Sequence, residues 1–232
     1  MKSIDDICFV IQTRLGSKRT PKKSIKPFAN STIFNIAIEN LMKSNLIPNE
    51  NIYISVYEQE LIDIASKYDV NIYKRSYESA NEHGSFSPKL IYEWHDKLPY
   101  KYCIFLSICS PLIKTETIDN FVKHYLNTKS EGLFSVVEKK QYFWNVDGES
   151  VTDWGGKTIM NTNLVKPLYE AAQCLYASRM DIIGENYWMD KNSPPKPELF
   201  VISEFESLDI DYPWQFEVAE LLYIKKKERN LL

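Results

Sequence analysis

Short apolar runs alternate with amphipathic stretches from the start of the chain, and this alternation restricts the possible folds more than any other feature. Residues 7–12 read as a buried strand, whereas residues 33–42 place their apolar side chains on one helical stripe. Residues 51–57 predict a second strand, 59–69 a second helix and 70–75 a third strand. Strands that alternate with helices build a parallel sheet, so we predict an α/β fold.

The same alternation covers most of the second half of the chain. The expected elements there are a helix over 89–96, a central buried strand over 102–108, a helix over 116–127, a strand over 132–140, strands over 173–179 and within 200–211, and a closing helix over 213–228. The closing helix has a proline at its first position, where a missing N–H costs nothing.

Residues 141–170 interrupt this rhythm. Aromatic side chains mix there with Gly, Asp and Asn, which favours turns and hairpins. Neither an internal repeat nor a low-complexity segment marks a boundary, so we predict one domain over residues 1–232 with an excursion at 141–170. The aromatic side chains at 142–144 are more typical of a subunit interface or a core surface than of a base-stacking platform.

Composition narrows the class of protein. The chain has 232 residues, a formal net charge of −3 and 44% hydrophobic residues, which is the balance of a globular protein. The slight acidity argues against a general nucleic-acid binder, and the absence of a long apolar run argues against a membrane span. The four cysteines lack C-x-x-C or metal-ligand spacing, which predicts reduced, buried thiols in a cytoplasmic protein.

A strongly basic loop follows the first predicted strand. Gly16 and Ser17 let the backbone turn and present amide groups, and cations flank them on both sides. Because α/β sheets bind ligands at the carboxyl ends of their strands, this position favours a polyphosphate site over a solvated basic turn. Neither the P-loop spacing G-x-x-x-x-G-K-S/T nor the dinucleotide spacing G-x-G-x-x-G is present. The five cations are Arg14, Lys18, Arg19, Lys22 and Lys23.

A pair of carboxylates lies near the end of the chain. Asp209 and Asp211 are two residues apart, so on an extended segment their side chains face the same side and repel one another unless a cation lies nearby. Taken alone, such a pair more often marks a strand end followed by a helix cap. Together with a polyphosphate loop it indicates nucleotidyl transfer, since magnesium neutralises the phosphates and orients the reacting one.

Two other segments are candidates for the wall of a pocket. Ser107 and Ser110 follow the central strand at the same predicted sheet edge. Arg75 ends the third strand and is a candidate for a nucleotide contact. The sequence leaves open the alternatives of an ordinary loop for the two serines and of a surface ion pair for Arg75.

These segments, taken in order, resemble the acylneuraminate cytidylyltransferases, which join CMP to sialic acid and related nonulosonic acids and, in a related branch, to Kdo. VIQTRLGSKRTPKKSIKPF at residues 10–28 is similar to their nucleotide-binding motif, and CSPLI at 109–113 to their T-S-P-L-R. YKR at 73–75 resembles their strand ending in arginine, and SLDIDYPWQFEVAE at 207–220 their closing motif. The segment at 161–183 resembles the one that reads Y-x-x-N-G-A-I-Y in that family.

The resemblance implies a Rossmann-like, GT-A-like nucleotidyltransferase fold with a mostly parallel sheet, in which the excursion pairs two subunits into a homodimer. It also implies CTP as the nucleotide and Mg²⁺ as the cofactor, with Asp209 and Asp211 as metal ligands. Arg14, Lys23 and Asp211 are the implied catalytic residues. The implied nucleotide-binding residues are Arg14, Gly16, Ser17, Lys18, Lys23, Arg75 and Ser110, with cytosine contacts in the neighbourhood of residues 75–87.

The implied reaction is transfer of CMP from CTP to the anomeric hydroxyl of an acidic sugar, with release of pyrophosphate, for surface glycan synthesis. Ser107, Gln173 and Tyr176 are expected to contact that acceptor. Neither a nucleic acid nor a membrane is an expected partner.

The chain departs from the family pattern mainly on the acceptor side. Ser107 stands where the family has glutamine, Ile113 where it has arginine, and Ala172 and Gln173 where it has Asn-Gly, while Ser24 replaces an asparagine of the basic motif. A nucleotidyltransferase of the same fold with a non-sugar acceptor, such as a phosphonate or a phosphorylated small molecule, is therefore an alternative. A catalytically silent nucleotide-binding homologue is another, although two clustered carboxylates argue against it. An RNA-binding basic patch is a weaker alternative.

Overall fold

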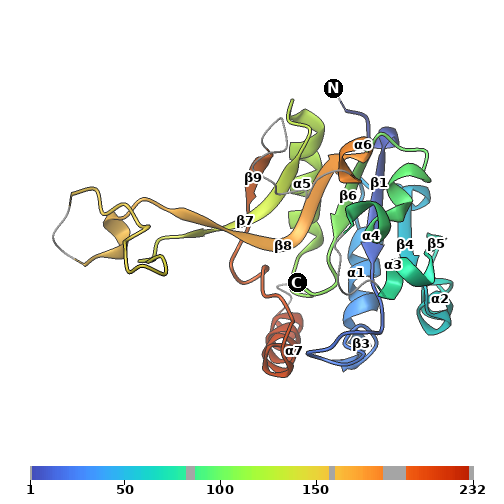
Figure 1. Ribbon diagram of the computed structural model, residues 1–232. Helices are drawn as coiled ribbons and strands as arrows, with labels where there is room; N and C mark the ends of the chain where they lie inside the picture. The colour runs from blue at the N-terminus through green and yellow to red at the C-terminus, as the bar shows by residue number, and fades with distance from the viewer. Residues whose placement is uncertain (1, 82–86, 157–159, 185–196, 230–232) are drawn as a thin grey trace.

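The protein is described by a computed structural model that covers residues 2–81, 87–156, 160–184 and 197–229. A seven-stranded sheet forms the centre of this part of the chain, in the order β5, β4, β1, β6, β8, β7 and β9 (Figure 1). Its strands are β1 (Ile7–Gln12), β4 (Ile52–Val56), β5 (Asn71–Lys74), β6 (Tyr102–Leu106), β7 (Leu133–Lys139), β8 (Leu168–Arg179) and β9 (Glu198–Val201). A separate pair is formed by β2 (Pro27–Phe28) and β3 (Ser31–Thr32).

Helices connect most of the strands. They are α1 (Ile33–Met42), α2 (Gln59–Ala65), α3 (Tyr77–Asn81), α4 (Pro88–Ile91), α5 (Thr115–Asn127), α6 (Met180–Ile183) and α7 (Pro213–Glu228), with short 3₁₀ turns at Ile4–Asp6, Asn49–Asn51, Glu93–Asp96 and Thr162–Leu164. Within the described residues, none of these helices is both long and apolar enough to cross a lipid bilayer.

The strand directions make the sheet mostly parallel. β1 pairs in parallel with β4 and with β6, β4 with β5, and β7 with β9. β8 runs antiparallel to both of its neighbours, β6 and β7. The predicted α/β class with a mostly parallel sheet is confirmed.

Side chains of β1 alternate between two apolar layers. Ile7, Phe9 and Ile11 belong to the larger core cluster, which also contains buried side chains of α1 and α5. Cys8 and Val10 belong to a smaller cluster on the opposite face, with side chains of the Glu93–Asp96 turn and of α6. Burial on both faces explains why this strand is a continuous apolar run, and its carboxyl end leads directly into the basic loop.

The helices with the strongest periodic signals lie where the sequence predicts them. α1 covers residues 33–42, with the Thr32 side chain accepting a hydrogen bond from the Asn35 N–H at 3.1 Å as its cap, and α7 covers 213–228. Other predictions were wrong in extent. The helix expected over 89–96 is the short α4 followed by a 3₁₀ turn, and the strand expected over 173–179 begins at residue 168. The helix expected over 59–69 ends at residue 65, and of the segment 200–211, where strand was expected, only residues 200–201 belong to β9.

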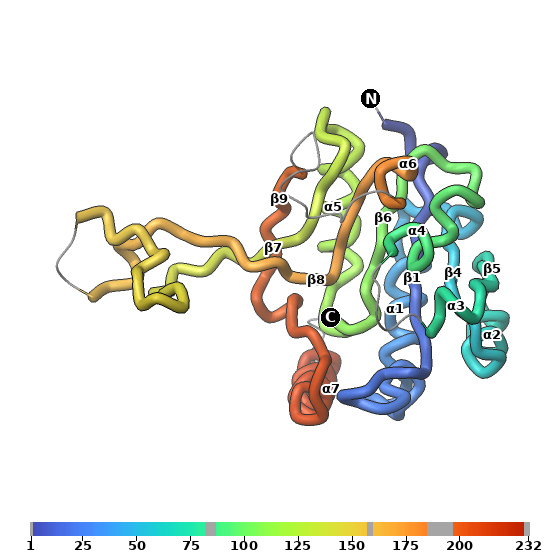
Figure 2. The backbone as a smooth tube through the Cα atoms, in the orientation of Figure 1, coloured from blue at the N-terminus to red at the C-terminus, as the bar shows by residue number. Residues whose placement is uncertain are grey.

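Between β7 and β8 the chain leaves the sheet and forms an arm, described over residues 140–156 and 160–167, that projects away from the rest of the molecule (Figures 1 and 2). Thr152, which is buried, ties its two sides together by accepting from the Phe143 N–H at 2.8 Å and donating to the Gln141 carbonyl at 2.9 Å. The rings of Tyr142 and Trp154 pack with their centroids 4.6 Å apart. The arm occupies the region where the sequence predicts the excursion.

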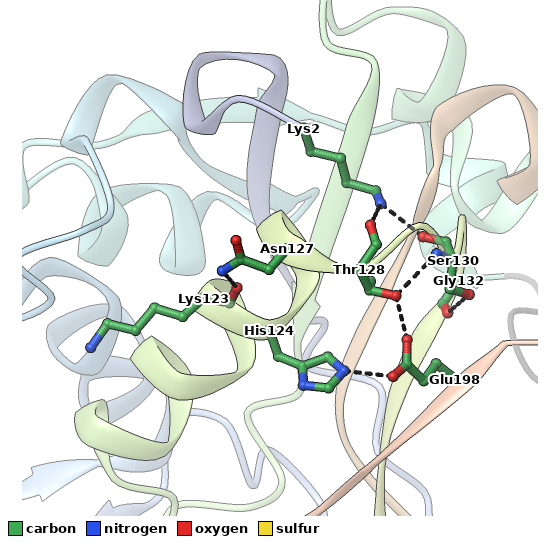
Figure 3. A network of polar contacts seen from close by, with 8 residues as sticks. All are labelled: Lys2, Lys123, His124, Asn127, Thr128, Ser130, Gly132 and Glu198. Carbon is green, nitrogen blue, oxygen red and sulfur yellow. Dashed lines mark hydrogen bonds and ion pairs between the residues drawn. The ribbon is translucent and has the colours of Figure 1, made fainter.

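A polar network attaches the start of β9 to α5 (Figure 3). Glu198 accepts a hydrogen bond from Thr128, and its other carboxylate oxygen lies 2.8 Å from His124 Nε2. Lys2 Nζ donates to the carbonyls of Thr128 and Ser130, each at 2.8 Å. The network thus fixes the start of β9, the strand that leads into residues 202–211.

Candidate active site

A cavity of about 500 Å³ opens at the carboxyl end of β1. Three segments meet in its wall: the basic loop (residues 13–23), the residues that follow β6, and the segment that leads into α7. Because β1 and β6 are parallel neighbours, the segments that follow them emerge at the same edge of the sheet. The lining residues are Gln12, Thr13, Arg14, Ser17, Lys18, Arg19, Lys23, Ser107, Ile108, Cys109 and Asp211.

Neighbouring elements hold the basic loop in place. Glu58, at the start of α2, accepts a hydrogen bond from the Leu15 N–H at 2.7 Å, and Arg14 Nη1 donates to the Ala80 carbonyl at 3.0 Å. The Ser17 N–H donates to the Leu15 carbonyl at 2.9 Å. This amide, one of those that the sequence predicts to be presented to a ligand, is therefore engaged within the loop.

Residues from the two ends of the chain are bonded to one another at this site. Thr20 Oγ1 donates to the Asp211 carbonyl at 2.9 Å, and Lys23 Nζ donates to the Ile210 carbonyl. On the other side, the Asp211 N–H donates to Gln215 Oε1 at 2.8 Å, within the capping box that starts α7. The backbone of Asp211 is thus held between the basic loop and α7.

Neither Thr20 nor Gln215, the two residues that hold the Asp211 backbone, is among the residues predicted from the sequence. A glutamine three residues after the position that caps a helix is the signal that could have found Gln215. Nothing in the sequence points to Thr20, because its partner lies 191 residues away along the chain.

Two cations of the basic loop form ion pairs with the Asp211 carboxylate. Arg19 Nη2 lies 2.6 Å from Asp211 Oδ1, and Lys23 Nζ lies 3.6 Å from the same oxygen. The Arg19 guanidinium also lies over the Tyr212 ring, 5.3 Å from its centroid. The Arg19 side chain is 53% exposed and that of Lys23 13%, so the first is a surface group and the second is packed into the wall.

Asp209 is half-buried two residues before Asp211. Burial raises the pKa of its carboxyl to about 6, the charge of Asp211 adds to the rise, and Lys23 and Arg19 oppose it. A divalent cation relieves this repulsion, and Mg²⁺ in particular binds through one or two carboxylates together with phosphate oxygens and water. In the part of the chain that the structure describes, no three His, Cys, Asp or Glu side chains converge. The carboxylate pair therefore fits a magnesium ion that arrives with a phosphate ligand.

The structure brings half of the predicted site residues to the wall of this cavity. Those that line it are Arg14, Ser17, Lys18, Lys23, Ser107 and Asp211. Those that do not line it are Gly16, Arg75, Ser110, Gln173, Tyr176 and Asp209, the last of which is close enough to Asp211 for the two charges to interact.

Arg75 lies behind the basic loop. Its side chain is buried, donates through Nη2 to the Ser79 carbonyl at 2.8 Å, and has no hydrogen-bond partner for Nε among the described residues. Burial lowers the pKa of its guanidinium to about 10, Glu58 opposes the shift and Arg14 adds to it. Of the neighbourhood expected to contact cytosine, residues 82–86 lie outside the described part of the chain.

The predicted acceptor residues lie on or beside β8. The Ser107 N–H donates to the Cys174 carbonyl at 2.9 Å, which places the irregular part of β8 next to the cavity wall. Gln173, in that irregularity, is exposed and has a φ of 56°, a left-handed conformation uncommon for a residue with a side chain. Tyr176 packs against the Phe105 ring with centroids 6.3 Å apart, and burial raises the pKa of its hydroxyl.

Ser110, the remaining predicted nucleotide contact, is buried, and its Oγ has no hydrogen-bond partner among the described residues. Ile113, which stands where the resembling family has arginine, is also buried. The segment after β6 therefore presents Ser107, Ile108 and Cys109 to the cavity and turns its last residues into the core.

This geometry is suited to one kind of chemistry. A polar cavity lined by cations can hold a polyphosphate, and a carboxylate pair at its edge can hold a divalent cation against that phosphate.

Comparisons with known proteins agree with this reading. The chain is 22% identical over 226 residues to the pseudaminic acid cytidylyltransferase of Campylobacter jejuni subsp. jejuni serotype O:2, and the match covers 92% of this chain and 94% of that protein. The fold matches CMP:2-keto-3-deoxy-manno-octonic acid synthetase complexed with CTP, with a TM-score of 0.67, 13% identity, and coverage of 95% of this chain and 99% of that one.

A second solved structure with this fold is 4-diphosphocytidyl-2C-methyl-D-erythritol synthase from Anaerococcus prevotii, with a TM-score of 0.65, 16% identity, and coverage of 96% of this chain and 98% of that one. Residues 8–190 match the sequence profile of the cytidylyltransferases, a span that holds the basic loop, most of the sheet and the arm. With this match over most of its length and a cation-lined cavity at the carboxyl end of β1, the chain belongs to the cytidylyltransferase family.

Proposed function

We propose that this cytidylyltransferase transfers CMP from CTP to the anomeric hydroxyl of an acidic sugar, with release of pyrophosphate and with Mg²⁺ as cofactor. The observation that carries the proposal is the meeting of the basic loop and Asp211 in one cavity, where Thr20 and Lys23 bind the backbone of the acidic segment. The names of two relatives, a pseudaminic acid cytidylyltransferase and an octonic acid synthetase, support an acidic sugar as the acceptor class.

The basic loop would bind the triphosphate. Arg14, Lys18 and Lys23 line the cavity and supply positive charge, and the Ser17 side chain lies between them. Arg14 is already oriented by its bond to the Ala80 carbonyl, so little side-chain freedom is lost when a phosphate binds to it. We assign the pyrophosphate leaving group to this cluster.

Asp209 and Asp211 would hold Mg²⁺, which when bound neutralises phosphate charge and polarises the phosphorus that is attacked. The contribution of the chain is to keep both carboxylates close despite their repulsion. Gln215 and Thr20 hold the Asp211 backbone from two sides, and burial keeps Asp209 in place.

The reaction forms a bond between the acceptor hydroxyl oxygen and the α-phosphorus and breaks the bond from that phosphorus to the bridging oxygen of the β-phosphate. The hydroxyl proton leaves to solvent or to a phosphate oxygen, and pyrophosphate departs with the electron pair. No covalent enzyme intermediate is required. Positioning of the two substrates and neutralisation of charge by Arg14, Lys23 and the metal site supply the rate.

The acceptor would enter beside Ser107 and the irregular part of β8, where Gln173 is exposed. A second candidate keeps the reaction and changes the acceptor to a phosphonate or a phosphorylated small molecule. Ile113 favours it, because a buried isoleucine replaces the arginine with which the resembling family continues this segment. We place the reaction in the cytoplasm, in the supply of activated sugar for surface glycans.

The test is pyrophosphate release with CTP, Mg²⁺ and a panel of acceptors: sialic, legionaminic, pseudaminic and Kdo-type acids, and phosphonates. ATP, GTP and UTP serve as nucleotide controls. We expect release with one of the acidic sugars and with CTP only. Release confined to phosphonates would replace the first candidate by the second, and equal release with all four nucleotides would contradict the assignment of CTP.

A further inference from the structure

Arg19 forms an ion pair with the Asp211 carboxylate, which the proposed function assigns to the metal. We propose that Arg19 is a resident counterion of Asp211 in the nucleotide-free protein, and that it exchanges onto the triphosphate when a divalent cation takes the carboxylate. The inference rests on the proposed function, because it assumes that Asp211 binds the metal. Arg19 would then link metal binding to nucleotide binding, because it pairs either with Asp211 or with the triphosphate.

The contacts of Asp211 Oδ1 carry the first step. Arg19 Nη2 lies 2.6 Å and Lys23 Nζ 3.6 Å from this one oxygen. A divalent cation on the same oxygen would stand within a few ångströms of a guanidinium, where like charges repel. One of the two cations must therefore move before a metal can bind to Oδ1.

Burial decides which of the two cations moves. Lys23 is only 13% exposed and also donates to the Ile210 carbonyl, so it is fixed in the wall. Arg19 is 53% exposed and is held by the ion pair and by its contact with the Tyr212 ring. Exposed ion pairs of this kind are weak, so Arg19 is the group that leaves.

The new position of Arg19 follows from the shape of the site. Arg19 lines the same cavity as Arg14, Lys18 and Lys23, so a triphosphate bound there lies within reach of its guanidinium. Guanidinium groups pair with phosphate oxygens through two parallel hydrogen bonds, which a single contact to Oδ1 does not provide. Metal arrival thus releases Arg19 to the nucleotide, and by linkage the nucleotide promotes metal binding to the same extent.

The chain offers a matched control for this effect. Lys22 belongs to the same loop and carries the same charge, but it pairs with Glu60 at 3.9 Å and not with Asp211. Arg19→Gln and Lys22→Gln therefore remove equal charge from one loop and differ in whether they free Oδ1. At an ionic strength near 0.15 M, the long-range effect of either charge on the metal is largely screened.

The experiment is a titration of the full-length protein with Mn²⁺ in the absence of nucleotide, followed by electron paramagnetic resonance of the unbound ion. We expect Arg19→Gln to lower the Kd for Mn²⁺ by about 2- to 5-fold relative to the wild type, the size of one exposed ion pair. Lys22→Gln should leave the Kd unchanged, and Asp211→Asn should raise it.

Two results would contradict the inference, and they differ in what else they remove. In the first, Asp211→Asn weakens Mn²⁺ binding, but Arg19→Gln, Lys22→Gln and the wild type have equal Kd values. That result would reject only the role of Arg19 and would leave the proposed metal site in place. Mn²⁺ binding that Asp211→Asn does not weaken would reject the metal assignment of the proposed function and, with it, the exchange. Circular dichroism of each variant verifies that the fold is retained.

Discussion

Asp209 is a residue whose environment opposes its proposed charge. Burial and the neighbouring Asp211 raise the pKa of its carboxyl to about 6, so without a metal the charged form is costly near neutral pH. Sites that bind a cation commonly carry such a cost in the empty state and recover it on binding. The two carboxylates are in this sense preorganised for an ion and not for the empty protein.

We expect Asp209→Asn to raise stability and lower activity together. The native protein binds the Asp209 proton more tightly than the unfolded chain does, so this group's contribution to the free energy of unfolding falls as pH rises from 3.8 to about 6. At pH 7.5, without metal, the neutral asparagine should therefore add up to about 3 kcal/mol. Chemical denaturation at pH 4 and at pH 7.5 measures this. A variant that is no more stable than wild type at pH 7.5 would contradict the burial argument.

Asp211→Asn should lower kcat by about 10² or more, the scale for loss of one well-placed electrostatic stabiliser. The asparagine side chain keeps the shape, and the backbone bonds from Thr20 and to Gln215 do not involve the carboxylate. Initial rates of pyrophosphate release over a range of Mg²⁺ concentrations provide the measurement. Wild-type turnover with unchanged magnesium dependence would exclude Asp211 as a metal ligand.

How far single residues were predictable depends on where their partners lie. Arg14, Ser17, Lys18 and Lys23 form one local motif, from which the sequence alone predicted a phosphate site, and the structure places all four in the wall of one cavity. The ion pair between Arg19 and Asp211 and the bond from Thr20 depend on a fold that brings distant segments together, and no local pattern encodes that distance.

At the scale of elements, the basic loop depends on its neighbours for its shape. Glu58 holds it from α2 and Thr20 holds it to the segment before α7. Thr20 is 2% exposed, so its hydroxyl cannot exchange its bond to the Asp211 carbonyl for one to water. This bond therefore joins the loop and the acidic segment into one unit.

Thr20→Val should disturb the position of the basic loop relative to Asp211 without removing any charged side chain. Valine has the same shape but lacks the donor, so the Asp211 carbonyl loses a partner and stability falls by about 0.5–1.5 kcal/mol. We expect the KM for CTP to rise as well, because the cations of the basic loop and Asp211 lose their fixed spacing. Thr20→Ser keeps the hydroxyl and should restore the KM. A Thr20→Val enzyme with normal KM and reduced Tm would indicate a structural role only.

Elements were predictable where the local signal is strong. α1 has a Thr32 cap and one apolar stripe, and α7 begins at Pro213, so both helices lie at the predicted residues. The extra length of β8 and its antiparallel direction arise from pairing with β6 and β7, which the residues of β8 alone do not reveal. The same holds for β9, a short strand that exists through its pairing with β7.

At the scale of the whole molecule, the arm exposes several large apolar side chains that pack against nothing in the described part of the chain closely enough to be buried. Its exposed side chains are Phe143, Trp144, Val146, Val151, Met160 and Leu164. A projecting hairpin with such side chains is typical of an interface, and for a single chain type the simplest partner is a second copy related by a two-fold axis. We infer that the arm pairs two subunits.

A glutamate in the arm should therefore shift the protein from dimer to monomer. Val151 is 52% exposed in the arm, and Val201 is 51% exposed on β9, which makes Val201→Glu a matched control on the body of the molecule. We expect Val151→Glu to raise the dimer dissociation constant at least tenfold and Val201→Glu to leave it unchanged. Light scattering during size-exclusion chromatography over a range of concentrations measures both. A monomeric wild type would contradict the inference that the arm pairs two subunits.

The bond between Thr20 and Asp211 spans 191 residues, and this separation has a consequence for the newly made protein. At a synthesis rate of about 5–20 residues per second, a ribosome delivers the basic loop about 10–40 s before the acidic segment that completes the site. The nascent chain can form β1, β4 and β5 early. It cannot bring the Asp211 carboxylate to the cations of the basic loop until the acidic segment and α7 have emerged. Asp209 and Asp211, the proposed metal ligands, are thus made long after the cations, and a molecule truncated before residue 209 would keep the cations and lack both carboxylates.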